Sequence, residues 1–450
     1  MSQTAALAKF VAESSLDDVP EPVREKATEA IADLVGVAIY GSHHEVGEKV
    51  ASYVETASPG TDATVLGRGT ASPSGAALAN GSFGHAVDFD DTFESIVLHP
   101  TSPVFCAALA AAEADGATGR DVLEAYVLGI DVAYRTGHAT YPSHYDHGWH
   151  STGTVGTFGA TAAAASVFDL SAERIRHAFG IAASASSSLK KNFGTMTKPL
   201  HSGHAAQMGV RSALLAAEGF TADREIFGGK LGYGNVMTPG GEYDPDELTA
   251  GFDGGWAVMD LGYKPYPSGV ITHAAMDAMR EIVVENDLDP DDVESVTVAL
   301  DEAASEMLHH ERPATGLEAK FSIEFCLAAI LRERDPGVHE FTTGYVTDDE
   351  TRNQTAKVSR AFEPNLFGGS FANYAARVSV TTRDGTEHAV EEKYAPGSPN
   401  NPLSEDRLRA KFDECAAAVV SDEEANTAYD AIRSLEEEGS LERLLDAVGN

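Results

Sequence analysis

The chain has 450 residues, with 70 acidic residues against 32 lysines and arginines, so its formal net charge is −38. Its hydrophobic fraction of 43% is that of a folded protein and excludes a largely disordered acidic chain. The charge disfavours nucleic acid and anionic membrane surfaces as partners, because both are bound by basic surfaces.

From the N-terminus to about residue 260 the sequence has helical periodicity. Apolar residues recur at helical spacing over Glu21–Tyr40, after a start that contains proline, and again over Gly119–Gly137. Pro103–Ala114, Thr157–Val167 and Gly203–Ala217 are rich in alanine and predict helices narrow enough to pack closely inside a bundle. Strand-like alternation is nearly absent from this part of the chain.

The pattern changes near Tyr263. Val293–Leu300 alternates and is rich in β-branched residues, which predicts a strand. Ala376–Thr382 and Glu387–Lys393 flank the tetrapeptide Arg-Asp-Gly-Thr, a strong signal for a hairpin. A helix is predicted over Glu318–Arg332.

The end of the chain returns to helix. Tyr394–Leu403 is predicted to be a linker, and Ser404–Ala447 a charged amphipathic helical segment. We therefore predict a mainly α protein with a large all-helical domain, formed by residues 1–262 and 403–450, and a smaller α+β domain inserted at residues 263–402. The C-terminal helices are expected to pack back on the first domain.

Carboxylates gather in the segment Ala79–Ser102, where Asp88, Asp90 and Asp91 precede Thr92 and His99 follows on a turn. A DxDD pattern can hold magnesium for a diphosphate substrate, but such a site also needs a second acidic cluster and basic residues for the phosphates, and the sequence shows neither in that arrangement. For Asp90 and Asp91, capping of helices and fixing of the His99 loop is at least as well supported as catalysis.

Histidines gather in the segment Tyr141–Gly159, which contains His144, His147 and His150. A zinc site is not predicted, because the segment has no HExxH motif, no clustered cysteines and no usual ligand spacing. A better interpretation places His150 at the start of a helix near Ser151–Thr154. Free backbone N–H groups and the helix dipole favour an anion there, and a histidine can exchange protons with it.

Lysines are scarce, so those near candidate histidines are informative. Lys198 and His201 stand at the head of the Ala-rich helix that follows, which favours an anion-binding role, whereas Lys190 and Lys191 are better explained as a solvated surface pair. Lys264 and His273 flank a Pro-X-Pro turn at the predicted domain junction, where small molecules usually bind. A core or capping role for His273 is about as well supported as a functional one.

These groups together predict a site for a small polycarboxylate that undergoes proton transfer beside a carboxylate or carbonyl. Cations stabilise the enolate-like charge that develops, and histidines carry the protons. Acyl and phosphoryl transfer are disfavoured, because the sequence has no GxSxG elbow, Walker A loop or cysteine nucleophile motif.

Compartment and surface follow from the remaining features. Cys106, Cys326 and Cys415 lie far apart without a CxxC motif, which predicts reduced, mostly buried thiols in a cytoplasmic protein. The N-terminus is not that of a secretory signal, and no apolar run approaches the length of a membrane span. The acidic excess favours a salt-adapted, halophile-like surface over that of an ordinary acidic enzyme.

Several long motifs in fixed order resemble the MmgE/PrpD family, which includes 2-methylcitrate dehydratase, cis-aconitate decarboxylase and iminodisuccinate epimerase. They are ANGSFGHAVDFDDT, GWHSTGTVGTFGA, LKKNFGTMTKPLHSGHAAQMGVRSALLAAEGF, KPYPSGVITHAAMDA, LEAKFSIEF and GSPNNPLSEDRLRAKF, and the resemblance runs to about Phe412. It implies a homodimer, a helical domain with the α+β domain as a lid, and a site between the domains that uses neither metal nor organic cofactor.

The resemblance also carries roles to single residues. The family's active-site positions fall on Asp88, Thr92, His99, His150 and Lys198, which are the catalytic candidates, and on Lys264 and His273, which with Ser151 and His201 are the substrate-binding candidates. The chain departs from the family at three points. Phe325 stands where relatives often carry tyrosine, Gly269 stands where a cysteine is common, and His99 lies one residue further from Thr92 than in decarboxylase-like members. These departures argue more against the decarboxylase than against the family as a whole.

The function predicted from these features is that of a hydro-lyase of propionate metabolism that dehydrates a polycarboxylate such as 2-methylcitrate. His99 or His150 would remove the proton beside a carboxylate, and the other histidine, or water held by Asp88 and Thr92, would protonate the leaving hydroxyl. The alternatives are a decarboxylase, epimerase or isomerase acting on cis-aconitate or a related acid. A non-catalytic polycarboxylate-binding protein is a more remote alternative.

Overall fold

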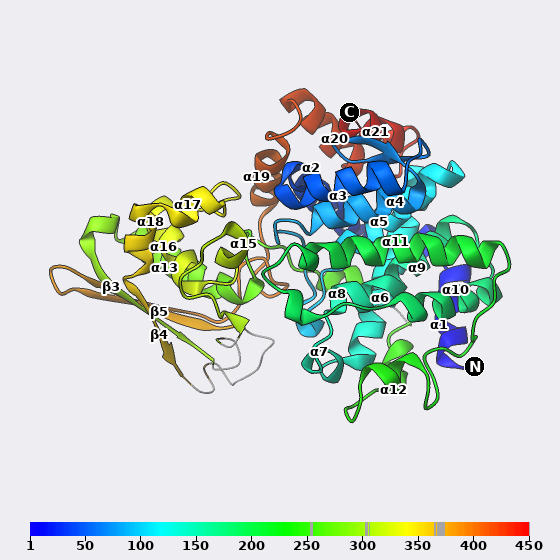
Figure 1. Ribbon diagram of the computed structural model, residues 1–450, viewed down its shortest axis with the longest axis horizontal. Helices are drawn as coiled ribbons and strands as arrows, with labels where there is room; N and C mark the ends of the chain where they lie inside the picture. The colour runs from blue at the N-terminus through cyan, green and yellow to red at the C-terminus, as the bar shows by residue number, and fades with distance from the viewer. Residues whose placement is uncertain (253–254, 302–304, 306, 364–365, 367–373, 450) are drawn as a thin grey trace. The chain divides into compact units, whose positions relative to one another are not determined.

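The computed structural model describes residues 1–252, 255–301, 305, 307–363, 366 and 374–449, and this part of the chain is mainly α-helical. It forms two compact units (Figure 1). Unit 1 consists of Met1–Ala86, Asp90–Leu261 and Glu405–Asn450, and unit 2 of Val87–Phe89 and Gly262–Ser404.

Unit 1 is built from helices and one short hairpin. Its N-terminal helices are α1 Gln3–Glu13, α2 Glu21–His43, α3 Glu45–Ala57, α4 Pro73–Gly84, α5 Thr101–Asp115, α6 Gly119–Thr140, α7 Ser143–Asp146, α8 Ser151–Thr154, α9 Gly156–Val167, α10 Ala172–Ala185, α11 Thr197–Ala217 and α12 Tyr233–Met237. The C-terminal helices are α19 Glu405–Ala416, α20 Asp422–Arg433 and α21 Ser440–Val448, and the strands β1 Ala63–Val65 and β2 Gly69–Ala71 pair antiparallel.

Helices α5 and α9 form the centre of unit 1, and both are rich in alanine. Both are buried over nearly their whole length, and α9 packs against α5, α6 and α11. A Cβ on Gly159 of α9 would come within 2.7 Å of the carbonyl oxygen of Gly129 in α6, so glycine sets the distance of this crossing. Helix α4 packs in turn against α5 and α11.

The C-terminal helices of unit 1 return to its N-terminal part. Helices α19 and α20 pack on α2, and Figure 1 draws them beside that blue helix. Lys411 of α19 forms a buried ion pair with Asp33 of α2, with Nζ 2.6 Å from Oδ1. Burial raises the pKa of Asp33, while Lys411 opposes this effect.

Unit 2 is an α+β unit with a four-stranded sheet of order β4-β3-β5-β6. Its elements are α13 His273–Glu285, β3 Val293–Leu300, α15 Gly316–Ala319, α16 Ile323–Glu333, α17 Thr343–Thr347, α18 Asp349–Thr355, β4 Val358–Phe362, β5 Ala376–Thr382 and β6 Glu387–Glu392. Strand β3 pairs parallel with β4 and antiparallel with β5, and the β5–β6 hairpin turns through Gly385, whose φ of 86° suits glycine.

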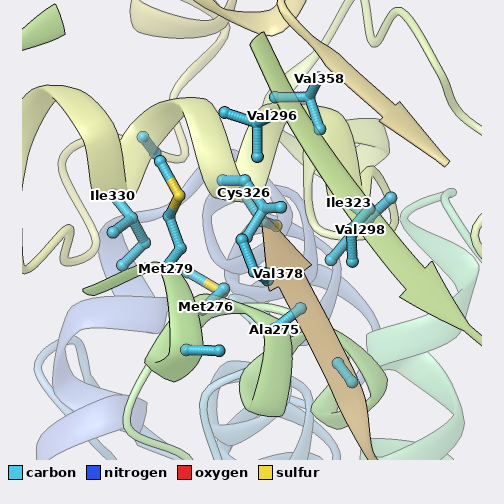
Figure 2. Close-up of a cluster of buried hydrophobic side chains, with 14 of the residues drawn as sticks. Ala275, Met276, Met279, Val296, Val298, Ile323, Cys326, Ile330, Val358 and Val378 are labelled. Atoms are coloured by element: carbon cyan, nitrogen blue, oxygen red, sulfur yellow. The ribbon is translucent and has the colours of Figure 1, made fainter. Parts of the chain in front are cut away.

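Helices α13 and α16 pack together, and α13 also packs on β5 and β6 and α16 on β4. The hydrophobic core of unit 2 lies at these contacts (Figure 2). Its labelled side chains come from both helices and three strands: Ala275, Met276 and Met279 of α13, Ile323, Cys326 and Ile330 of α16, Val296 and Val298 of β3, Val358 of β4 and Val378 of β5.

Most predicted elements are confirmed, with β3 and β5 at the predicted bounds. Two predictions were wrong in detail. The helix predicted over Glu318–Arg332 is two helices, because Ser322 caps α16 through the N–H of Phe325 and ends the continuity. Helix α11 begins six residues before Gly203, at Thr197. The segment Ser404–Ala447 is helical, as predicted, and folds as three helices.

Two further expectations concern cysteines and membranes. Cys106, Cys326 and Cys415 are free and buried, as predicted, and burial raises the pKa of all three thiols. Among the described residues, no helix is both long enough and apolar enough to cross a membrane.

Candidate active site

Four buried histidines of unit 1, His85, His99, His150 and His201, lie together and are called the histidine cluster below. The ring centroid of His85 lies 4.9 Å from that of His99 and 5.8 Å from that of His150. The ring centroids of His150 and His201 are 5.2 Å apart. The four residues come from three distant parts of the chain, so the fold and not local sequence assembles them.

His85 and His99 stand at the two ends of the loop that follows α4. His85 comes directly after the last residue of α4. The backbone N–H of His99 donates to Thr152 Oγ1 at 3.2 Å, and His99 Nδ1 donates to the carbonyl oxygen of Asp91 at 2.8 Å. Because a carbonyl only accepts, Nδ1 of neutral His99 carries the proton and Nε2 has the lone pair.

His150 precedes α8, as predicted, and Ser188 fixes its backbone by accepting from the His150 N–H and donating to its carbonyl oxygen. Val155 continues the helical conformation from α8 into α9. The Nδ1 atom of His150 lies 3.0 Å from Nδ1 of His201 in α11, so one of these two rings donates and the other accepts.

Lys198 lies in the first turn of α11, one turn before His201, and its side chain is buried with Nζ 5.5 Å from the centre of the Phe193 ring. Burial and then the charges of His85 and Lys198 hold the pKa of His150 well below its usual value. The same causes lower the pKa of His201 to about 4. Both rings are therefore neutral at neutral pH, beside a buried cation.

The three aspartates of the DFDD sequence have different partners, so they do not form the shared carboxylate site of the magnesium hypothesis. Asp90 contacts His85, with both carboxylate oxygens 2.9 Å from Nδ1. Asp91 accepts from the hydroxyl of Thr101 at 2.5 Å, and burial raises its pKa well above the usual range. Asp88 belongs to unit 2.

In unit 2, Asp88 adopts a left-handed backbone conformation with a φ of 56°. Its carboxylate forms a buried ion pair with Lys264, whose Nζ also donates to the carbonyl oxygen of Asp88 at 3.1 Å. His273 begins α13, is fully buried, and donates from Nε2 to the carbonyl oxygen of Ser268 at 3.3 Å. This pattern suits the core or capping role as well as a functional one.

The structure thus divides the predicted site residues into two groups. His99, His150, Lys198 and His201 gather in unit 1, and Ser151 and Thr92 are buried in the same unit. Asp88, Lys264 and His273 lie in unit 2. His144 bonds instead to Thr154 and the carbonyl of Met237, His147 is exposed, and Lys190 stands over the Tyr145 ring at 3.5 Å beside an exposed Lys191.

Sequence reasoning missed His85 and gave Asp90 no site role. The signal was present in GHAVDFDD, where a histidine and a carboxylate stand five residues apart after a helix. Only the turn between them brings these two side chains together. His85, Asp90 and His99 each offer one ligand atom, and these atoms lie within 4.8 Å of one another, so this triplet could also hold a metal ion.

The two departures in unit 2 have structural explanations. Phe325 is fully buried and packs edge-on against Phe341, with ring centroids 5.3 Å apart, so it is a core residue. A Cβ at Gly269 would lie 3.3 Å from the Phe321 ring, a close contact that a small ring movement would relieve.

Comparison with known proteins identifies the family to which the chain belongs. The MmgE/PrpD N-terminal domain matches residues 5–246, and the MmgE/PrpD C-terminal domain matches residues 266–437. The chain is 29% identical to a cis-aconitate decarboxylase of Mus musculus over 99% of this chain and 93% of that protein. It is 27% identical to a cis-aconitate decarboxylase of Homo sapiens, over 97% and 92% of the two chains.

A cis-aconitate decarboxylase of Aspergillus terreus is 25% identical, over 98% of this chain and 95% of its own length. These relatives support the decarboxylase alternative better than the 2-methylcitrate dehydratase that the sequence favoured, despite the departures at Phe325, Gly269 and His99. Two family domains in order, covering most of the chain, establish that this protein belongs to the MmgE/PrpD family.

Proposed function

We propose that this protein is a cofactor-independent lyase that removes CO2 from cis-aconitate or a closely related unsaturated tricarboxylate. The observation that carries the proposal is the near full-length similarity to cis-aconitate decarboxylases. The buried histidine cluster with Lys198 supports it, because decarboxylation of a polyanion needs cationic charge and a proton donor.

The chemistry divides into two steps. The C–C bond to one carboxylate breaks, CO2 leaves, and the electron pair passes into the adjacent double bond and its carboxylate. A carbon atom then takes a proton, which gives an unsaturated dicarboxylic acid. The first step spreads negative charge over the substrate, and the buried Lys198 would stabilise that charge.

His150 and His201 fit this chemistry because they are neutral. A neutral imidazole can donate from one nitrogen and accept at the other, so the bonded pair can orient a carboxylate and exchange protons at the same time. Their low pKa values also limit the positive charge of the cluster. Asp88, Thr92, Ser151, Lys264 and His273 stay predictions for the roles that the family resemblance implies.

The experiment uses the purified protein with cis-aconitate and, in parallel, with 2-methylcitrate. Release of CO2 in step with loss of cis-aconitate supports the proposal. New ultraviolet absorbance of an alkene from 2-methylcitrate, without CO2 from cis-aconitate, would instead identify a dehydratase. Thermal stabilisation by either acid with no turnover of either would identify a binding protein.

The proposal includes a homodimer, which the family resemblance implies, and a cytoplasmic location, which the widely spaced cysteines predict. Each chain has a mass of 47.4 kDa, so light scattering of the purified protein distinguishes a monomer from a dimer directly. Fluorescence of a tagged full-length chain in cells tests the location.

A further inference from the structure

His85 and Asp90 form a buried pair that takes no part in the two steps of the proposed reaction. Both side chains are almost completely buried, and Nδ1 of His85 lies 2.9 Å from each carboxylate oxygen of Asp90. An ionised carboxylate only accepts hydrogen bonds, so the ring donates from Nδ1 and its tautomer is fixed. A carboxylate in this position also stabilises the imidazolium form of the ring.

The other ring nitrogen of His85, Nε2, differs from Nδ1 in its hydrogen bonding. Nε2 of His85 is buried and has no hydrogen-bond partner among the residues that the structure describes. The ring lies beside His99 and His150, the two histidines carried over from the family. Buried polar atoms are rarely left unbonded, and those that are often belong to a reacting group.

The cluster gives its histidines different environments. His99 donates to a backbone carbonyl, and His150 shares a hydrogen bond with another histidine, whereas His85 contacts a carboxylate. The positive charge of His85 is one of the causes that lower the pKa of His150. Neighbouring titratable groups whose environments push their pKa values apart usually serve as a separate acid and base.

We propose that His85 is a further catalytic residue, whose Nε2–H donates the proton that the substrate carbon takes up. Asp90 holds the other proton of the ring on Nδ1. This inference rests on the proposed decarboxylase function. When the C–C bond breaks and CO2 leaves, the electron pair remains on the organic anion, and the Nε2 proton then forms the new C–H bond. His85 becomes neutral, keeps its Nδ1 proton, and regains the Nε2 proton from water.

Other titratable groups surround the pair and must be considered in any pH profile. Those that face His85 or Asp90 are His99 in the loop, His150 at the start of α8, His201 in α11, Asp33 in α2, Asp91 in the loop and Cys106 in α5. The test therefore uses a shift between variants and not the profile of the wild type alone.

The first experiment measures kcat and KM for CO2 release from cis-aconitate as a function of pH. We expect His85→Gln to lower kcat about 100-fold or more with little change in KM. In Asp90→Asn the basic limb of the kcat profile should move to lower pH, because the imidazolium loses its carboxylate. His144→Gln is the matched control, since His144 is another histidine of unit 1 that is 1% exposed, as His85 is, but it lies outside the cluster.

The outcomes separate the two proposals. An active wild type with near-normal kcat in His85→Gln overturns the role of His85 and leaves the decarboxylase function intact. Equal losses in His85→Gln and His144→Gln, with an unshifted profile in Asp90→Asn, reduce the pair to a structural feature. A wild type that releases no CO2 overturns the function itself.

The second experiment addresses the metal that His85, Asp90 and His99 could hold. The purified enzyme is treated with a chelator and its metal content and activity are measured. We expect no stoichiometric metal and unchanged turnover, because the Asp90 carboxylate is already used by Nδ1 of His85. Loss of activity on chelation, restored by one equivalent of a divalent ion, would overturn the acid–base role.

Discussion

His150 and His201, two residues of the proposed site, are joined by a hydrogen bond between their rings. Only one hydrogen joins their Nδ1 atoms, so the tautomer of one ring sets that of the other. Substitution of either ring therefore disturbs both.

We expect His150→Gln to lower kcat by about 100-fold to 10,000-fold, because a positioned group that moves protons or stabilises charge contributes on that order. Steady-state CO2 release measures the effect, and circular dichroism checks the fold. His147→Gln is a suitable control, since His147 is exposed and lies three residues away in the same segment. Near-normal turnover in His150→Gln would contradict the assignment.

His144 makes a separate prediction about stability, because it is buried but outside the cluster. Its Nδ1 bonds to the carbonyl of Met237 and its Nε2 to the hydroxyl of Thr154. Burial lowers its pKa from 6.5 to about 4. The folded state therefore prefers the neutral ring, and this contribution is complete above pH 6.5 and declines as the pH falls toward 4.

From these two pKa values, His144 should remove about 2 kcal/mol from the free energy of unfolding between roughly pH 7.5 and roughly pH 5. Urea unfolding at both pH values measures it. In His144→Gln this part of the decrease should disappear, whatever the carboxylates contribute, because they are common to both proteins. An equal decrease in the variant and the wild type would show that His144 does not titrate as expected.

At the level of elements, the crossing of α4 and α11 holds part of the cluster in place, since α11 carries Lys198 and His201. A Cβ on Gly203 of α11 would collide with the carbonyl oxygen of Leu78 and the hydroxyl of Ser82, both in α4. Gly81 of α4 lies at the same crossing, and a Cβ added to it would lie 2.9 Å from the Gly203 Cα. The backbones of the two helices are thus in direct contact.

We expect Gly203→Ala to lower the free energy of unfolding by about 1–3 kcal/mol, because the backbone of α4 cannot move aside cheaply. It should also reduce turnover, because α11 must shift. Urea unfolding and CO2 release measure the two effects. Gly344→Ala in α17 is the control, since nothing lies within 4 Å of its Cβ position, and it should be neutral or slightly stabilising. A stabilised Gly203→Ala would contradict the packing argument.

Periodicity located the helices and strands because it reports which face of an element is buried. It placed α2, α5, α6, α9 and β3 within a few residues. It could not find the break between α15 and α16, where a capping serine and not the apolar pattern ends the helix. Strand β4, which pairs parallel with β3 after a long crossover, was missed because its five residues place two polar residues, Ser359 and Arg360, side by side and so lack the alternation that indicates a strand.

The site was predicted through motifs and not through geometry. Motifs singled out His99, His150, Lys198 and His201, and the structure gathers these four. The sequence shows a histidine and a carboxylate five residues apart, but the contact between His85 and Asp90 depends on a turn that a one-dimensional pattern does not specify. Motif order alone also could not choose between dehydration and decarboxylation, since both reactions need histidines and cations beside a carboxylate.

At the scale of the whole molecule, salt affects the net charge of −38 and the buried cations differently. Most charged residues face solvent, where their mutual repulsion opposes the compact state and is screened by salt. Lys198 and the histidine cluster are buried, so salt screens them much less. Added salt should therefore stabilise the fold without dismantling the cationic site.

We expect the thermal unfolding midpoint to rise by roughly 2–4 °C when KCl increases from about 0.1 M to about 2 M, because relief of repulsion contributes about 2–4 kcal/mol and a chain of this length shifts by about 1 °C per kcal/mol. Most of the rise should come below about 1 M, where the Debye length has already fallen to about 3 Å. Scanning calorimetry over a KCl series measures it, and NaCl at equal ionic strength should give the same curve. Sucrose at matched osmolality is the uncharged control and should give a smaller, linear rise. A midpoint that falls or stays constant with KCl would mean that the acidic surface is not a salt adaptation. In that case charge repulsion does not destabilise the fold at low salt, so screening of the repulsion cannot stabilise it.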